Sequence, residues 1–205
     1  MFVKICGLTH EESVAAALDA GADAIGFVFA PSVRQISPLD AARLAAPARG
    51  RALCVAVTRH PTSAQIEEIF EIFAPDWLQT DHTDMTSLSP DVLERLLSAR
   101  VLPVYRESES LPAELPARVL FEGAVSGVGR TANWAMARAA ARRTQLLLAG
   151  GLNPENVVEA IRHVQPWGVD VSSGVESAPG KKSAKKIHQF VSAAKSVIDT
   201  AAAAI

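Results

Sequence analysis

The sequence predicts a single-domain (β/α)8 barrel, in which eight parallel strands form a closed sheet inside a ring of helices. Short apolar runs alternate with helical segments eight times along the 205 residues, at about 25 residues per unit. Such alternation indicates parallel strands, because each helix returns the chain to the starting edge of the sheet. An open doubly wound sheet of the Rossmann type is the alternative, but no GxGxxG motif follows the first strand. We therefore expect one domain over residues 1–205, with short loops.

Eight runs rich in Val, Ile, Leu and Phe supply the expected strands, and most of them end at a glycine, a proline or a polar residue. They cover residues 3–6, 24–29, 52–57, 76–80, 101–105, 118–122, 145–149 and 169–172.

Start signals mark the helices between these strands. Thr9 and Glu12 have the spacing of a capping box, and Ser37-Pro38 and Ser89-Pro90 each place proline at a first helical position. Asn153-Pro154 is a similar start signal. The expected helices cover residues 13–19, a segment from 38, and residues 64–73, 90–97, 134–143, 154–163 and 187–198.

The fifth unit differs from the others. Pro112 and Pro116 stand too close together for a regular helix to form between them. We therefore expect the helix of unit five to be reduced or missing.

Composition and charge exclude several classes of protein. The chain is 49% hydrophobic with a formal net charge of -2 and no block of one sign, which argues against nucleic acid or an anionic membrane as a partner. No run is long enough to span a bilayer, and no secretory leader is visible, so we expect a cytoplasmic protein. Cys6 and Cys54 form neither a metal-binding spacing nor a disulfide framework. A monomer is expected, because no long apolar surface stretch stands out.

The active site of such a barrel lies at the carboxyl ends of the strands. Lys4 and Cys6 share one face of the first strand there, because side chains alternate along a strand. A lysine beside a thiol favours the reactive thiolate. Alternatively, Cys6 is a small core residue and Lys4 extends its stem toward solvent.

Two other strand ends favour phosphate binding. Gly150-Gly151 follows the seventh strand, and Ser172-Ser173-Gly174 follows the eighth. Small residues, hydroxyls and accessible backbone N–H groups in these two loops form the usual phosphate site of (β/α)8 barrels. Asp170 shares a face with Ser172, and closure of the barrel places it opposite Lys4. This pair is either purely structural or a binding site for substrate hydroxyls.

Five motifs follow one another along the chain: Lys4-Ile5-Cys6-Gly7, Gly26-Phe27-Val28-Phe29, Ser32-Val33-Arg34-Gln35-Ile36-Ser37-Pro38, the segment from Gly150 to Val157, and the segment from Val169 to Glu176. With these motifs in this order, the sequence resembles phosphoribosylanthranilate isomerase over nearly its whole length, as far as Lys182. The resemblance implies an Amadori rearrangement of N-(5-phosphoribosyl)anthranilate in tryptophan biosynthesis, without a metal or cofactor. It implies that Cys6 is the general base and that Arg34 binds the anthranilate carboxylate, to which a guanidinium is well matched.

Two departures from the family pattern affect the site. The family's acid is an aspartate at the end of strand six, where this chain has Glu122, and the loop over residues 124–131 looks shorter than usual. We expect Glu122 to be the general acid and to have a raised pKa through partial burial under that loop. Strand four ends Gln79-Thr80-Asp81-His82 in place of Gln-Leu-His-Gly. Gln79 keeps its place and is assigned to substrate binding, whereas His82 is expected to be a loop residue.

The remaining alternatives are other sugar-phosphate proteins on the same barrel. A metal-dependent epimerase would need histidines on several strand ends, and a histidine-pathway isomerase would have two aspartates where this chain has Cys6 and Glu122. A catalytically inactive barrel that binds phosphosugars is supported only by the Asp-to-Glu change.

Overall fold

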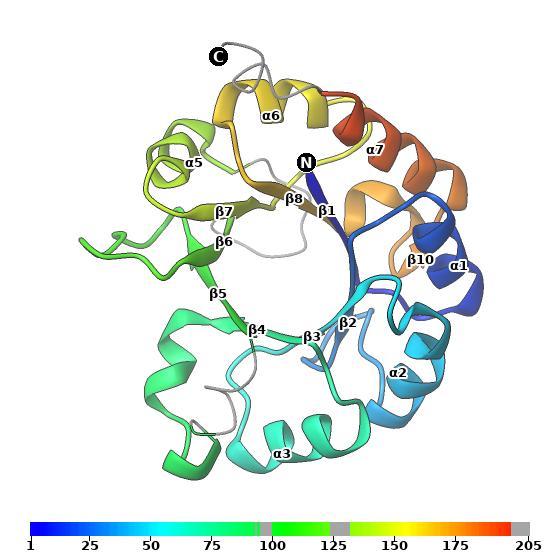
Figure 1. Cartoon of the computed structure of the whole chain (residues 1–205), viewed down its shortest axis with the longest axis vertical. Coiled ribbons are helices and arrows are strands. Elements are labelled where there is room, and N and C mark those ends of the chain that lie inside the picture. The colour runs from blue at the N-terminus through cyan, green and yellow to red at the C-terminus, as the bar shows by residue number, and fades with distance from the viewer. Residues whose placement is uncertain (93, 95–99, 124–131, 198–205) are drawn as a thin grey trace.

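The computed structural model describes residues 1–92, 94, 100–123 and 132–197 of the chain. Eight parallel strands close into one barrel, in which each strand pairs with the next along the chain and β8 pairs with β1. Figure 1 shows this ring of strands with the helices outside it. The predicted (β/α)8 barrel is confirmed, and the predicted strand bounds differ from the observed ones by at most one residue at either end. The strands are β1 (Phe2–Cys6), β2 (Ala24–Val28), β3 (Leu53–Val57), β4 (Trp77–Asp81), β5 (Arg100–Arg106), β6 (Arg118–Glu122), β7 (Gln145–Leu148) and β8 (Gly168–Val171).

Helices follow most of these strands and pack on the outside of the barrel. A short antiparallel hairpin, β9 (Glu176–Ala178) and β10 (Lys181–Lys182), stands between β8 and the last helix. Residues 90–92 and 94 are helical, and the rest of the helix expected at 90–97 lies outside the described residues. The helices are α1 (Glu11–Asp19), α2 (Pro38–Ala45), α3 (Ser63–Ile72), α5 (Trp134–Ala141), α6 (Val157–Val164) and α7 (Ala184–Ser196), with the short 3₁₀ helices η1 (Ala46–Ala48), η2 (His82–Thr86) and η3 (Ser173–Val175).

Unit five lacks a helix, as predicted. Residues 107–117 connect β5 to β6 through turns and irregular backbone only. In Figure 1 this green segment projects outward from the barrel wall. No helix therefore covers the barrel wall between β5 and β6, as the close spacing of Pro112 and Pro116 predicted.

Three predicted helix starts were wrong. α1 begins at Glu11 with His10 as its N-cap, and Thr9 Oγ1 lies 2.8 Å from His10 Nδ1, so the expected capping box does not form. α6 begins at Val157, because Asn153 Oδ1 accepts hydrogen bonds from the backbone N–H groups of Glu155 and Asn156, which form a turn before the helix. α7 begins at Ala184, where Ser183 caps it. In each case a local side-chain contact decided the boundary.

Side-chain alternation gives the barrel two apolar layers. Residues such as Ile5, Phe27 and Phe121 point outward and form the main core with the helices. A second cluster fills the barrel interior and includes Val55, Trp77, Leu102, Val104, Leu120 and Leu147. This interior packing closes the centre of the barrel, so any site must lie at one of its ends.

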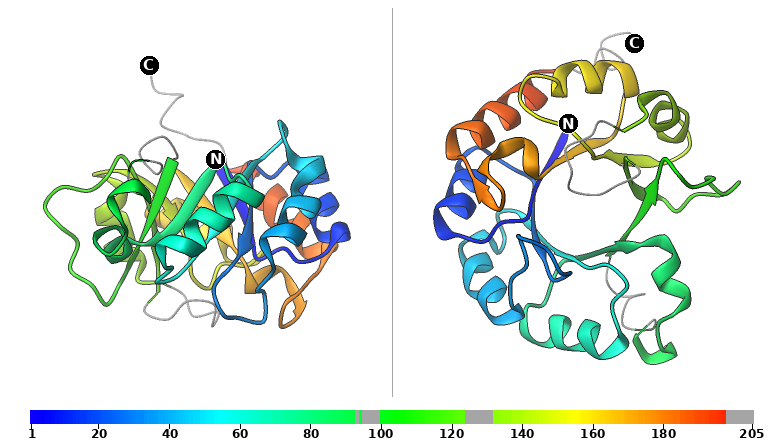
Figure 2. Two further views of the ribbon diagram at one scale, coloured as in Figure 1. Left: turned by 90° about the horizontal axis from the view of Figure 1, so that it is seen from below. Right: turned by 180° about the vertical axis from the view of Figure 1, so that it is seen from behind.

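The amino end of the barrel is closed by a stack of rings around a cation. The guanidinium carbon of Arg118 lies 4.5 Å from the ring centroid of Trp77 and 4.4 Å from that of Trp167. Phe2 stacks on Trp167 with centroids 4.4 Å apart. In the side view of Figure 2, the β9–β10 hairpin and the loop after β2 project from the opposite end, away from the N-terminus. That carboxyl end is where polar residues enter the barrel interior.

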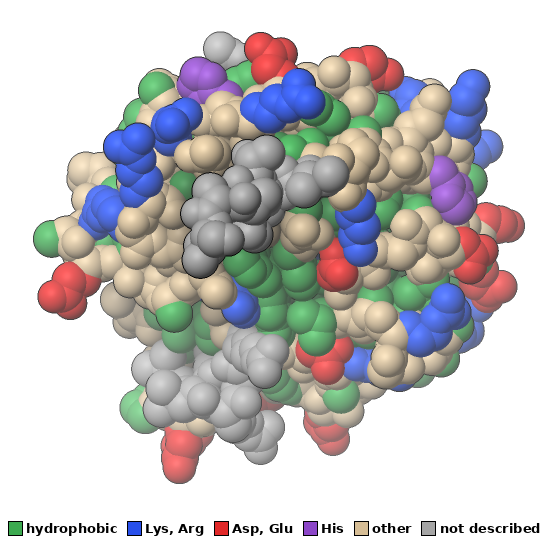
Figure 3. Space-filling model, turned by 45° about the horizontal axis from the view of Figure 1, so that its top comes forward, with side chains coloured by type: hydrophobic (Ala, Val, Ile, Leu, Met, Phe, Trp, Pro, Cys, Tyr) green, Lys and Arg blue, Asp and Glu red, His purple; other side chains and the backbone are tan. Residues whose placement is uncertain are grey.

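Among the residues that the structure describes, no helix is both long and apolar enough to cross a membrane. Figure 3 shows acidic and basic side chains interspersed on the face that it presents. This mixture agrees with the small net charge of -2.

Candidate active site

The carboxyl ends of the strands bring polar side chains into the barrel mouth. They occupy the positions that continue the interior face beyond the apolar cluster, because every second residue of a strand points inward. Most are buried, so their charges need partners. These residues are Lys4, Cys6, Gln79, Asp81, Arg106, Glu122, Asp170 and Ser172.

Lys4 and Asp170 form the ion pair that barrel closure predicted. The two residues are register partners between β1 and β8, and Lys4 Nζ lies 2.8 Å from Asp170 Oδ1. The Lys4 side chain is fully buried, so the alternative in which it reaches solvent is wrong. Burial lowers the pKa of Lys4, but the charges of Asp170 and Cys6 outweigh this effect and raise it. Lys4 is therefore a buried cation at the barrel mouth.

Cys6 lies beside this pair as a buried thiol. Burial raises its pKa above the ordinary value, although the charges of Lys4 and Lys182 act in the opposite direction. The expected help from Lys4 is present, but in this structure it does not outweigh burial. The thiol is therefore favoured over the thiolate.

Arg34 is held by a carboxylate that the sequence analysis did not assign. Its Nε and Nη2 atoms donate to Glu176 Oε1 and Oε2 at 2.7 and 2.9 Å. Lys182 Nζ lies 2.8 Å from Glu176 Oε1 and also donates to Ser172 Oγ at 3.1 Å. Burial raises the pKa of Glu176, but Arg34 and Lys182 outweigh it and lower the pKa to about 2. Glu176 ends the motif segment that begins at Val169, and Lys182 marks the end of the resemblance; these positions were the signal available for finding them.

The two predicted phosphate segments meet at one cavity. Gly151, Ser173 and Gly174 line a cavity of about 480 Å³, together with Arg34 and Glu176. A Cβ atom on Gly174 would lie 1.8 Å from the carbonyl oxygen of Leu152, so this close approach requires glycine. Gly150 and Ser172 adjoin the cavity without lining it, and Ser172 instead contacts Lys182.

Gln79 is a buried side chain of β4 with an unused acceptor. It is 7% exposed, and its Oε1 atom has no hydrogen-bond partner among the residues that the structure describes. A buried acceptor without a donor is costly and uncommon. This position suits the binding of a substrate hydroxyl or N–H group.

Glu122 shares a guanidinium with a second carboxylate. Arg106 Nη2 lies 3.1 Å from Glu122 Oε1 and 2.6 Å from Asp81 Oδ1. Burial lowers the pKa of Arg106, but the hydrogen bond to Asp81 and the charges of both carboxylates outweigh it and raise the pKa, so the cation is permanent. A neighbouring cation favours an ionised carboxylate, which opposes the protonated Glu122 expected from burial. The loop expected to bury it, at 124–131, lies outside the described residues.

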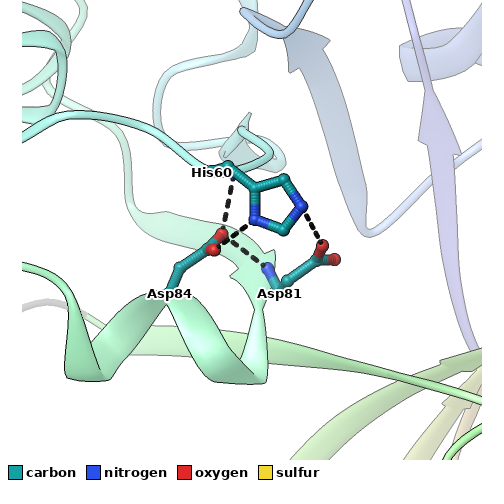
Figure 4. A group of neighbouring side chains, drawn as sticks. All are labelled: His60, Asp81 and Asp84. Carbon is teal, nitrogen blue, oxygen red and sulfur yellow. Dashed lines mark hydrogen bonds and ion pairs between the residues drawn. The ribbon is translucent and has the colours of Figure 1, made fainter.

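Asp81 also belongs to a cluster at the rim, shown in Figure 4 with His60 and Asp84. His60 Nδ1 lies 2.7 Å from Asp84 Oδ1, and its Nε2 lies 3.5 Å from Asp81 Oδ2. Such a group is close enough to share a cation. However, Asp84 Oδ2 already accepts from Thr80 Oγ1 and two backbone N–H groups, and Asp81 is paired with Arg106. We therefore interpret the cluster as a hydrogen-bonded brace and assign no metal to it.

His82 lies outside the barrel mouth, and it belongs to a 3₁₀ helix that directly follows β4, not to a loop as expected. It begins η2 and stacks on Tyr105 with ring centroids 4.3 Å apart.

Comparisons with known proteins identify the family of the chain. The family model described as N-(5'phosphoribosyl)anthranilate (PRA) isomerase matches residues 3–193. The chain belongs to this family. A relative of that name from Bradyrhizobium sp. is 38% identical, over 95% of each chain.

Solved structures of this family share the fold. A phosphoribosyl anthranilate isomerase from Thermus thermophilus has a TM-score of 0.81 at 29% identity, covering 96% of this chain and 99% of that one. Another, in complex with reduced 1-(o-carboxyphenylamino)-1-deoxyribulose 5-phosphate, has a TM-score of 0.73 at 31% identity, covering 96% and 100%. The alternatives from other barrel families are therefore set aside.

Family membership gives meaning to the two departures noted in the sequence. Glu122 and Asp81 stand where the resemblance implies an aspartate and a histidine. The structure brings both onto the same guanidinium, that of Arg106. Arg106 directly follows the strand predicted over residues 101–105, and it was assigned no role from the sequence.

Proposed function

We propose that this protein converts N-(5-phosphoribosyl)anthranilate to 1-(2-carboxyphenylamino)-1-deoxyribulose 5-phosphate, with Cys6 as general base and Glu122 as general acid. Its family identifies the reaction as an aldose–ketose isomerisation in tryptophan biosynthesis. The observation that carries the residue roles is the placement of Cys6 and Glu122 at the carboxyl ends of β1 and β6. Around the ring β7 and β8 separate β6 from β1, so the two groups can approach a bound sugar from different sides of the barrel mouth (Figure 1).

The chemistry needs one proton delivered and one removed. The acid protonates the furanose ring oxygen, and the C1–O bond breaks to give an open-chain Schiff base. The base then removes the proton from sugar C2, and the resulting enolamine becomes the ketone product. General acid–base catalysis of this kind contributes about 10²–10⁴-fold for each positioned group.

Cys6 must lose its proton before it can act as base, and its burial opposes this loss. Lys4, fully buried beside it, supplies a fixed positive charge that favours the thiolate. Asp170 opposes the thiolate, so the balance depends on how firmly Lys4 is held. A bound substrate that excludes water strengthens each of these interactions.

The remaining residues are proposed to hold the two charged ends of the substrate. Arg34 binds the anthranilate carboxylate, with Glu176 fixing the Nε edge of its guanidinium. The phosphate binds at Gly150, Gly151, Ser172, Ser173 and Gly174, while Lys4, Asp170 and Gln79 bind sugar hydroxyls. The complex of a relative with a reduced product analogue supports a small-molecule ligand of this class. Sulfate or phosphate soaked into crystals should bind at the cavity lined by Gly151, Ser173 and Gly174.

We also propose that the chain acts as a single-domain, cytoplasmic monomer without a metal or cofactor. Its exposed large apolar side chains, such as Val33 and Leu39, are few among the residues described. A relative from Thermotoga maritima is described as dimeric, so size-exclusion chromatography with light scattering should test this point.

Growth rescue tests the function most directly. The gene should restore growth without tryptophan to an auxotroph that lacks the isomerase. The purified protein should convert the substrate at a rate that Cys6→Ser and Glu122→Gln both lower. A chain that binds phosphosugars but gives no rescue would be an inactive barrel.

A further inference from the structure

Arg106 lies between two carboxylates on the inner wall of the barrel. It is the register partner of Glu122 on β6, and its Nη2 atom contacts both Glu122 Oε1, at 3.1 Å, and Asp81 Oδ1 on β4, at 2.6 Å. The three side chains are only 11%, 13% and 6% exposed, respectively. Their interaction is therefore weakly screened by solvent, and each charge depends on the other two.

The second oxygen of Asp81 faces the rim and is held there. Asp81 Oδ2 lies 3.5 Å from His60 Nε2 and 3.8 Å from Arg59 Nε. His60 is itself fixed, since its backbone N donates to Asp84 Oδ2 at 3.0 Å and its Nδ1 meets Asp84 Oδ1 (Figure 4). Both oxygens of the Asp81 carboxyl group therefore lie close to nitrogen atoms of neighbouring side chains.

This arrangement places two opposing influences on the ionised form of Glu122. The Arg106 guanidinium favours the ionised carboxylate, and an ionised carboxylate cannot donate a proton. A second carboxylate on the same nitrogen adds a negative charge near Glu122, which favours uptake of a proton. Asp81 has the shorter of the two contacts with Arg106 Nη2. It therefore offsets part of the stabilisation that this cation gives to ionised Glu122.

We propose that Arg106 and Asp81 are positioning residues for the acid: Arg106 holds the Glu122 carboxyl over the barrel mouth, and Asp81 limits how strongly Arg106 stabilises its ionised form. The inference rests on the proposed role of Glu122. Arg106 by itself would oppose protonation of Glu122. Asp81 reduces this effect, because its carboxylate contacts the same guanidinium.

Other charged groups face this trio. Glu109 Oε2 accepts from the backbone N of Arg106 at 3.1 Å, and its Oε1 lies 4.0 Å from Arg106 Nη1. His82 Nδ1 lies 3.5 Å from Glu109 Oε2. Across the mouth, Lys4 and Asp170 form a pair with no formal net charge. Of the charged groups named here, Asp81 is the one that contacts Arg106 Nη2 together with Glu122.

The test is the pH profile of the single-turnover rate between pH 5 and 10. The limb that belongs to Glu122 is identified by its absence from the profile of Glu122→Gln. Asp81→Asn removes one negative charge from beside Arg106 and Glu122, so this limb should move to lower pH by about one unit or more. Arg106→Gln removes the cation, so the same limb should move to higher pH by about one unit or more. Two control variants should leave this limb near the pH of the wild-type protein. Arg106→Lys keeps the positive charge. Asp19→Asn makes the same Asp-to-Asn change at an exposed position of α1.

A purely structural role predicts a different result. It would lower the rate or the melting temperature in both variants without moving the limb in opposite directions, and that result overturns the inference. If Glu122→Gln loses turnover but the limb stays still, the inference fails while the proposed acid survives. If Glu122→Gln keeps full turnover, both fail.

A second measurement tests the inference even if the Asp81 and Arg106 variants do not fold. Infrared difference spectra of the wild-type protein against Glu122→Gln follow the protonated carboxyl band of Glu122 through a pH titration. The proposal expects a midpoint above the ordinary range of glutamate carboxyls, and a midpoint below that range overturns it.

Discussion

Lys4 Nζ and Asp170 Oδ1 lie 2.8 Å apart in the closed seam between β1 and β8, and the Lys4 side chain has no exposure to solvent. Removing one partner of a buried pair leaves a charge without compensation, which costs about 3–5 kcal/mol. Asp170→Asn should therefore lower the free energy of unfolding by roughly this amount, as measured by urea denaturation. The double variant Lys4→Met, Asp170→Leu is the control, since it removes both charges. If that double variant is less stable than Asp170→Asn, the cost is not electrostatic.

Glu176 should make stability depend on acid pH. Its pKa of about 2 lies below the ordinary value of 4.5, so its ionised form is bound more tightly in the folded state. The stabilisation is fully present above pH 4.5 and is lost as pH falls toward 2; the shift corresponds to about 3 kcal/mol. Glu176→Gln should be less stable at pH 7 and should show a flatter dependence between pH 5 and 2. Equal slopes in the two proteins would contradict this assignment.

Arg34 should act mainly on substrate binding. Arg34→Ala removes the charged partner proposed for the anthranilate carboxylate, so KM should rise about tenfold or more with a smaller change in kcat. Arg34→Lys keeps the charge but loses the two-pronged contact with Glu176, and it should fall between the wild type and the alanine variant. An unchanged KM in Arg34→Ala would make this residue part of the hairpin scaffold only.

Cys6 should be required for turnover and slow to alkylate at neutral pH. Cys6→Ser changes the volume little, so it should fold and lose most of its activity, because a hydroxyl does not ionise near pH 7. Iodoacetamide reacts with the thiolate, and burial raises the pKa of Cys6, so inactivation should accelerate as pH rises. Cys54→Ala removes the other buried thiol, with a pKa of about 11, and should leave the inactivation unchanged. Protection by product would place the thiol in the substrate site; full activity of Cys6→Ser would move the base to Asp170.

Glu122 should be the acid, with a side-chain length matched to its surroundings. Glu122→Gln should lose about a hundredfold or more in turnover, the usual scale for a lost general acid. Glu122→Asp should also lower activity, because the shorter side chain withdraws the carboxyl group from Arg106 Nη2, now at 3.1 Å. Steady-state kinetics of both variants gives the answer. A fully active Glu122→Gln would make Asp81 the next residue to test.

Much of this site was predictable because the backbone alone places it. Lys4 and Asp170 are 166 residues apart, yet closure of an eight-stranded barrel forces β1 beside β8 and sets their register. Alternation then turns both side chains inward. The predicted partnership followed from periodicity and topology, and needed no knowledge of side-chain conformation.

The contacts of Arg34 were of another kind. Glu176 lies 142 residues away, in a hairpin whose turn packs Gly180 against the backbone of Val33. No repeating pattern fixes the position of such a hairpin. The same is true of Arg106 on β5, which contacts Asp81 on β4, 25 residues earlier, as well as its register partner Glu122 on β6.

The sequence by itself determined the barrel, the missing helix of unit five and the strand ends that carry the chemistry, because periodicity and proline act locally along the chain. Only the tertiary structure decided how the charges share their partners: Glu176 with Arg34 and Lys182, and Arg106 with Asp81 and Glu122. The physical reason is that electrostatic stabilisation of a buried charge depends on distances of a few ångströms between groups far apart in the chain. Burial likewise decided the state of Cys6, which Lys4 two residues away could not set alone.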